Sequence, residues 1–240
     1  MKKIVLFVVS SLLMTSLLAQ DSTASRVTPK SAPPRANDHF MIQYGYAGWS
    51  GIPDTINAGG FSKTFNVFFM LNLPFRTNPK LSMAIGGGIA SDHIKFKDTY
   101  VGIKERTATL PFVDQSDTNH FKKTKLVTTY LEAPLELRYT KNPENSDKSF
   151  KFAVGLRAGL LINAHTRNKG VRNKEGSTID DYTMKEHSKR FFNTTRFVGT
   201  ARVGWGHFSL FGSYQLNALF KEGVGPDVKP FSIGLTLSGL

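Results

Sequence analysis

The sequence predicts an all-β fold, an antiparallel up-and-down β-barrel of eight strands that crosses a membrane with those strands. Three observations carry this prediction. Eight segments alternate apolar and polar side chains with a period of two, charged residues inside them fall on one face, and the connections alternate between short and long. Alternation with a period of two is the signature of a strand. An uncharged outer face is what lipid requires, and the interior of such a barrel tolerates polar groups.

The N-terminal residues have the three parts of a secretory signal. Lys2 and Lys3 supply positive charge, residues 4–14 are largely apolar, and the segment ends on the small residue Ala19. We therefore predict a signal peptide over residues 1–19. An uncleaved membrane anchor is the alternative, but the apolar run is shorter than the ~20 residues that a helical span needs.

The next segment, residues 20–38, is polar and contains proline without apolar periodicity. We predict a flexible periplasmic segment here. The rest of the chain, residues 39–240, is then a single outer-membrane β-barrel domain. The chain offers no later apolar stretch of the length of a transmembrane helix.

Eight segments of residues 39–240 show the alternation. Four are clear: 61–73, 126–139, 150–164 and 230–238. Four are weaker: 39–48, 81–96, 192–205 and 208–219. The number is even, as in most bacterial outer-membrane barrels.

Charged side chains within the strands fall on the face opposite the apolar one. These predicted lumen residues are Glu132, Glu136, Arg138, Lys151, Arg157, Arg196 and Arg202. The interior of an eight-stranded barrel is just wide enough for side chains, and buried charges have to be paired. We therefore predict a salt-bridge network that fills the lumen. The alternative is general acid and base catalysis by the two glutamates. Neighbouring arginines disfavour this alternative, because they keep the carboxylates ionised and so make them poor acids.

The lengths of the connections also favour a membrane barrel over a soluble sandwich. Connections 74–80, 140–149 and 205–207 are short, and they alternate with longer ones at 49–60, 97–124, 165–191 and 220–229. A membrane barrel has short periplasmic turns on one side and longer surface loops on the other, whereas a sandwich has no reason to sort its loops in this way.

Aromatic residues at the strand ends predict two belts at the membrane interfaces. At the periplasmic ends we place Phe40, Phe75, Tyr139, Phe150, Trp205 and Phe208. At the outer ends we place Tyr46, Trp49, Phe61, Phe96, Phe192 and Phe220.

The chain is strongly basic, with 31 Lys and Arg against 18 Asp and Glu. Such a balance suggests a protein that binds nucleic acid. An exported protein, however, more often meets the phosphates of lipopolysaccharide, which basic residues can also contact. The basic residues of the loop 165–191 are Arg167, Lys169, Arg172, Lys174, Lys185, Lys189 and Arg190. Two interpretations remain open: they contact lipid phosphates or an acidic partner, or they keep the loops soluble.

Little else points to chemistry. The chain has no cysteine, which excludes disulfides, thiolate catalysis and cysteine metal sites. His207-Phe-Ser209 resembles the His and Ser pair of lipid A deacylases, but it lies at a predicted periplasmic turn. Asp180 and Asp181 could hold a cation, and a solvated acidic pair is the simpler interpretation. We predict no catalytic residue, cofactor or metal.

One strand carries a resemblance to a known family. Tyr130-Leu-Glu-Ala-Pro-Leu-Glu-Leu-Arg-Tyr139 resembles the strand motif of the PorT-like outer-membrane β-barrel proteins, in which two aromatics and a proline punctuate an apolar strand. The glycine-rich strand Ala84–Ala90 before it and Gly155-Leu-Arg-Ala-Gly159 after it are similar to that family's layout. The resemblance implies the fold and the compartment, and it leaves the task open.

Together these features predict a non-enzymatic protein of the cell outer membrane in a Gram-negative bacterium. We expect a lumen filled by side chains and basic surface loops that contact lipid head groups, lipopolysaccharide or an envelope protein. A lipid-modifying enzyme or a narrow pore are the alternatives. The sequence leaves the oligomeric state undefined.

Overall fold

The computed structural model describes residues 40–239. The predicted signal peptide (1–19) and periplasmic segment (20–38) lie outside the described residues. Within residues 40–239 the fold is all-β, with strands β1 to β11 and one short 3-10 helix, η2 (Pro143–Lys148). No helix of this range has the length and hydropathy to cross a membrane.

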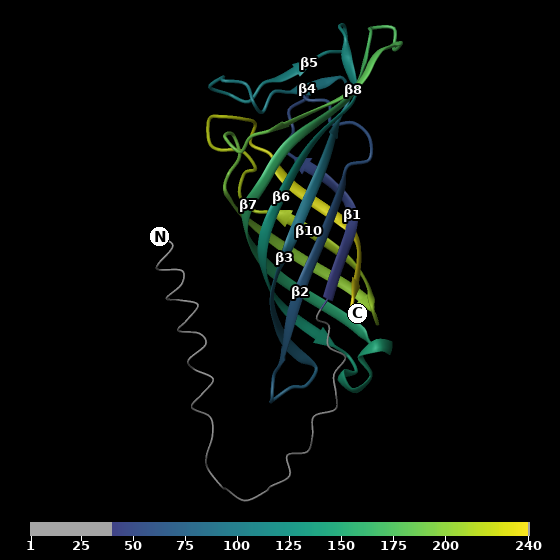
Figure 1. The fold of residues 1–240 in the computed structure, drawn as a ribbon. Coiled ribbons are helices and arrows are strands. Elements are labelled where there is room, and N and C mark those ends of the chain that lie inside the picture. Colours follow the sequence, from purple (N-terminus) through teal and green to yellow (C-terminus); the bar gives the residue numbers. More distant parts are fainter. Residues whose placement is uncertain (1–39, 240) are drawn as a thin grey trace, which may run out of the picture. The chain divides into compact units, whose positions relative to one another are not determined.

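Eight strands form a hydrogen-bonded ring in one antiparallel sheet (Figure 1). They are β1 (Phe40–Ser50), β2 (Lys63–Pro74), β3 (Leu81–Phe96), β6 (His120–Thr140), β7 (Phe150–Arg172), β9 (Thr195–Trp205), β10 (Phe208–Gln215) and β11 (Lys229–Ser238). Their order is β6-β3-β2-β1-β11-β10-β9-β7, and β7 pairs in turn with β6. Each of the eight is therefore paired on both sides. The all-β, antiparallel prediction is confirmed, and each predicted strand overlaps one strand of the ring.

The ring has two different ends. The "turn end" holds the short connections 75–80, 141–149 and 206–207, together with Phe40 and Ser238. The "loop end" holds the longer connections 51–62, 97–119, 173–194 and 216–228, and in Figure 1 it lies at the top. The last short connection is a tight hairpin in which Gly206 has a φ of 59°, a conformation that glycine adopts without strain.

The predicted loop 165–191 is largely a hairpin. Strand β7 continues to Arg172, and β8 (Thr178–His187) runs back along it. The prediction was wrong because the alternation here is between buried and exposed polar residues. Thr166 and Asn168 are buried and Arg167 and Lys169 exposed, so no apolar periodicity marks the strand. A second small sheet, β4 (Thr99–Val101) with β5 (Phe112–Asp114), lies within the connection 97–119.

The outward faces of the ring strands form an apolar band. On β3, for example, Met83, Ile85 and Ile89 are exposed by 38–49%. The band covers about nine residues on β3 (81–89) and on β6 (131–139) and about thirteen on β7 (150–162). A transmembrane strand needs about 9–11 residues, so each of the three is long enough to span the membrane. Strands β3, β6 and β7 continue beyond this band toward the loop end. So large an exposed apolar surface marks a membrane or interaction face.

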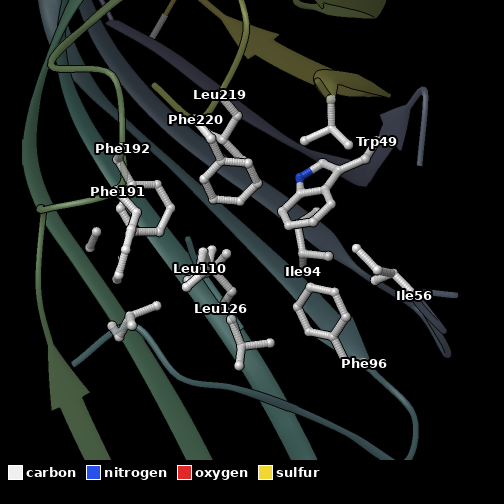
Figure 2. Packing of buried hydrophobic residues seen from close by; sticks show 14 of the residues in the cluster. Trp49, Ile56, Ile94, Phe96, Leu110, Leu126, Phe191, Phe192, Leu219 and Phe220 are labelled. Carbon is white, nitrogen blue, oxygen red and sulfur yellow. The ribbon is translucent and has the colours of Figure 1, made fainter. Parts of the chain in front are cut away.

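A hydrophobic cluster fills the ring at the loop end (Figure 2). Four of the aromatics predicted for the outer belt belong to it: Trp49, Phe96, Phe192 and Phe220 are at most 9% exposed. Trp49 packs edge-on against both Phe96 and Phe220, with centroids 5.4 and 5.7 Å apart. The belt prediction was therefore wrong at these four positions, whereas Tyr46 and Phe61 point outward.

The alternation itself explains the two strand residues of this cluster. On β1 the odd-numbered residues face inward, so Trp49 follows Met41 and Gln43 into the ring. On β3 the even-numbered residues face inward, and Phe96 is one of them. Phe192 and Phe220 lie outside the strands of the ring, joined by an isolated bridge. The alternation of each strand therefore predicts the direction of these side chains better than their position near a strand end does.

Candidate functional site: the charged interior of the ring

The alternation of β6 turns three charged side chains into the ring. Glu132, Glu136 and Arg138 are buried, whereas their neighbours Leu131 and Leu137 are exposed on the outer face. A strand sends successive side chains to opposite faces, so one register sets all of them. By the same rule β7 contributes Lys151 and Arg157, and β9 contributes Arg196 and Arg202; all seven predicted lumen residues are 9% exposed or less.

The first ion-pair group lies midway along the barrel and joins the four strands β3, β6, β7 and β9. Arg196 donates from Nε to the Glu132 carboxylate and from Nη1 to Asp92, the latter at 2.8 Å. Arg157 Nη1 lies 3.7 Å from Glu132 Oε2. Two guanidiniums therefore share one glutamate, and Arg196 bridges two carboxylates. Charges buried in this way need such partners, because an isolated one costs several kcal/mol or more.

The second group lies nearer the turn end and centres on Glu136. Its Oε2 accepts from Arg138 Nε at 3.0 Å and from Arg202 Nη2 at 2.9 Å. Lys151 lines a small cavity with Arg138 and Arg202 at this level. Glu136 thus joins its own strand β6 to β9 across the interior.

Neutral polar groups extend the first group across the ring. Arg157 Nη2 donates to Gln43 Oε1 at 2.9 Å, and Asn66 Nδ2 donates to the same oxygen at 3.2 Å. Gln43 Nε2 in turn donates to Thr236 Oγ1 at 3.0 Å. Strands β7, β1, β2 and β11 are connected through this one amide. The guanidinium of Arg157 also stacks 4.8 Å from the ring centre of Phe68.

The interior is closely filled. Two small cavities inside the ring, one near Lys151 and one near Arg157, have volumes of about 10 Å³ each, which is the space of about one water molecule. Glycine makes room for the ion pairs: a Cβ at Gly159 would lie 3.1 Å from both Arg196 Cγ and Glu132 Cγ. The interior is therefore packed with side chains, and the carboxylates of Glu132 and Glu136 are paired with guanidiniums.

Sequence reasoning missed three members of this network, Asp92, Gln43 and Asn66. Each follows from the alternation of its strand. Asp92, for example, continues the series of even-numbered, inward-facing residues of β3 that includes Ala84 and Ala90, and all three are buried. Asn163 lies outside this network. A bulge at Ile162 shifts the register between β6 and β7 and puts Asn163 with His165 and His187 outside the strands' inner face.

The remaining candidates are dispersed. His207 Nδ1 donates to the carbonyl oxygen of Ser238 at 3.0 Å, whereas Ser209 is buried inside the ring. Asp180 pairs with Val171 in the β7–β8 hairpin. Across residues 40–239, no three His, Asp or Glu side chains are arranged to hold a metal ion.

The seven basic residues expected in a loop lie mostly on strands. Arg167, Lys169 and Arg172 belong to β7 and Lys185 to β8. Lys174 lies in the turn between these strands, 3.3 Å from Asp117. Lys189 and Arg190 follow β8, and Arg190 stacks on the Phe191 ring at 5.4 Å. They share the loop end, and they are spread along the hairpin rather than gathered in one site.

The apolar band, the ring of strands and the polar interior agree with a comparison with known protein families. Residues 24–222 match the outer membrane protein β-barrel domain. No curated protein matches the chain. The match covers more than half of the chain and takes in every strand of the ring except β11. This chain therefore belongs to the outer membrane protein β-barrel family, and its strands cross the cell outer membrane.

Proposed function

We propose that this protein is a non-enzymatic, non-conducting outer-membrane barrel that works through its exposed surfaces. The eight strands close the barrel, the turn end faces the periplasm and the loop end faces outward. One observation supports this most: the interior is occupied by paired charges, with residual cavities of about one water each. Such an interior leaves the loop end and the outer face for contacts with lipid head groups or an envelope partner.

The loop-end cluster supports the same proposal. Ile103 and Leu110, from the connection 97–119, pack with Trp49 and Phe220 inside the ring. The long connections therefore cover the mouth with a dry apolar layer, above the charged layer. An ion would have to cross both layers, and a charge in an apolar layer is costly.

Planar-bilayer recordings test the closed lumen. We expect purified wild-type protein to show no steady current. Glu132→Ala together with Ile103→Ala, which opens both layers, should produce leak events where each single variant produces fewer. A stable single-channel current from wild-type protein would replace this proposal by the narrow pore.

Trypsin added to intact cells tests the orientation. Lys174 lies 63% exposed in the turn between β7 and β8, so we expect cleavage there. Lys141 and Lys148 lie in the short connection at the turn end and should be spared. Cleavage at either of these in sealed cells would show that the barrel is inverted.

Labelled lipid A incubated with the protein tests the enzyme alternative, and released acyl chains would contradict the proposal.

A further inference from the structure

Outward-facing cations stand directly opposite one another on four adjacent strands, just beyond the apolar band. Lys95 of β3 pairs with Lys125 of β6, Lys125 with Arg167 of β7, and Arg167 with Lys185 of β8. One row further out, Lys123 pairs with Lys169. We call these six side chains the basic ladder: Lys95, Lys123, Lys125, Arg167, Lys169 and Lys185.

This arrangement is unfavourable in the protein alone. Like charges directly opposite on a sheet destabilise it. Burial, followed by Lys95, Lys63 and Arg167, lowers the pKa of Lys125. Within residues 40–239 none of the six forms an ion pair with a carboxylate, and the nearby Glu186 instead accepts from the Tyr100 hydroxyl at 3.2 Å. Among the described residues the six cations thus have no carboxylate partner, and their charge is suited to binding an anion.

Polar side chains separate the ladder from the apolar band. Ser91 Oγ lies 3.1 Å from Thr129 Oγ1, and Asn163 contacts His165 and His187 at 3.2 and 3.3 Å. They come from β3, β6, β7 and β8, the same strands as the ladder. Hydroxyls, amides and imidazoles of this kind are suited to sugar hydroxyls.

An apolar groove lies below this row, within the band. Small residues on three neighbouring strands, Gly87, Ala133 and Ala158, form part of its lining, and Leu131 and Phe197 contribute larger side chains. Its volume is about 460 Å³. From the groove outward, the same strands therefore present apolar surface, then polar groups, then cations.

We propose that the groove and the basic ladder bind one phosphorylated glycolipid of the outer leaflet, with an acyl chain in the groove and the phosphates on the ladder. The order of apolar, polar and cationic surfaces matches the order of chain, sugar and phosphate in such a lipid. The ladder lies just beyond the polar row that follows the apolar band, so a lipid whose chain lies in the membrane can reach it with its phosphates. This position favours a lipid over an acidic protein. This inference rests on the proposed orientation of the barrel.

The test uses the full barrel in nanodiscs of neutral phosphatidylcholine. Bisphosphorylated lipid A, dephosphorylated lipid A, phosphatidylglycerol and inorganic phosphate are titrated separately, and bound lipid is counted by native mass spectrometry. We expect retention of bisphosphorylated lipid A over all three others. Lys125→Gln with Arg167→Gln should weaken that binding about thirtyfold, as expected for two cations at lipid phosphates.

Two further variants separate charge from groove. Lys104→Gln with Lys189→Gln removes the same charge elsewhere at the loop end and should leave binding unchanged. Ala133→Phe fills the groove and should weaken lipid A while preserving the preference for its phosphorylated form. Equal loss in the control variant, or equal binding of phosphatidylglycerol, would overturn the proposal.

The outcomes also separate this inference from the function on which it rests. If trypsin shows the loop end outside and the barrel does not conduct, but phosphorylated and dephosphorylated lipid A bind alike, the glycolipid site is wrong and the proposed function stands. An acidic protein that binds the ladder while lipid A does not bind would also overturn it. If the barrel is inverted, the proposed function itself fails first.

Discussion

The interior of the ring has two regions of opposite character. Toward the turn end it is filled by ion pairs around Glu132 and Glu136, and at the loop end by a dry cluster around Trp49 and Phe220. What differs is the medium outside the wall. The loop-end cluster lies beneath connections that meet water, so burying its rings gains the hydrophobic effect. The charged region lies behind the apolar band, where lipid is already as apolar as any core.

This difference predicts different responses to substitution. In the charged region, each buried carboxylate depends on directional ion pairs, so the loss of one partner leaves the remaining charges with less compensation for their burial. In the cluster, stabilisation follows buried apolar area, so it can be lost in steps. The two tryptophans report separately: Trp49 is in the cluster, whereas Trp205 is 61% exposed at the turn end.

The largest effect is expected from Arg157→Ala. It removes the partner that Glu132 and Gln43 share and leaves a cavity among buried polar groups, at a cost of about 3–5 kcal/mol in the free energy of unfolding. Urea unfolding in lipid vesicles, followed by Trp205 fluorescence, measures it. Lys174→Ala, whose ion pair is exposed, should cost about 0–1 kcal/mol. Equal effects of the two variants would show that water already screens the interior.

A smaller and more local effect is expected from Ile103→Ala. Ile103 is fully buried in the cluster, and truncation of such a residue costs roughly 2–3 kcal/mol where the surrounding loop can relax. Trp49 fluorescence should shift, and protease should cut the connection 97–119 faster, while the gel mobility of the unheated barrel stays as it is. Ile179→Ala, at an exposed site on β8, is the matched control. A barrel that unfolds as a whole would contradict the independence of the two regions.

Gly159→Ala probes how tightly the charged region is packed. The added methyl group would meet Arg196 and Glu132 at 3.1 Å, and such overpacking costs roughly 1–3 kcal/mol. Gly212→Ala has open space around the new methyl and should leave stability within about 0.5 kcal/mol. If the two variants unfold at the same urea concentration, the ion pairs are loosely held.

The smallest expected effect is a pH response of the β7–β8 hairpin, beyond the apolar band. Burial, with Lys185 and His187 of β8, His93 of β3 and Arg167 of β7, lowers the pKa of His165 to about 4 from 6.5. The folded hairpin therefore binds fewer protons, and its stability falls as the pH drops from 6.5 toward 4. Hydrogen exchange in β8 should accelerate over this window relative to free peptide. His165→Gln should remove the acceleration, and its persistence would assign the response to another group.

The alternation of inward-facing and outward-facing residues made most of the ring predictable from the sequence. Strand 81–96 coincides with β3, and the charges of β6, β7 and β9 follow from their apolar neighbours. Where both faces of a strand are polar, as in β8, the alternation carries no signal. Ion-pair partners were equally hidden, because Arg196 reaches Asp92 of β3 across the ring, and only the three-dimensional register brings these strands face to face.

The lengths of β6 and β7 have a practical consequence. They contain 21 and 23 residues, about twice what a membrane span needs. At about 3.3 Å per residue, the ten residues from Asn163 to Arg172 give the hairpin a reach on the order of 30 Å past the apolar band. At its tip, Gly176 has a φ of 85° and open space around it. If trypsin shows that the loop end faces outward as proposed, this turn is where a peptide epitope could be inserted for display on living cells, held clear of the lipid by a stiff two-stranded stalk.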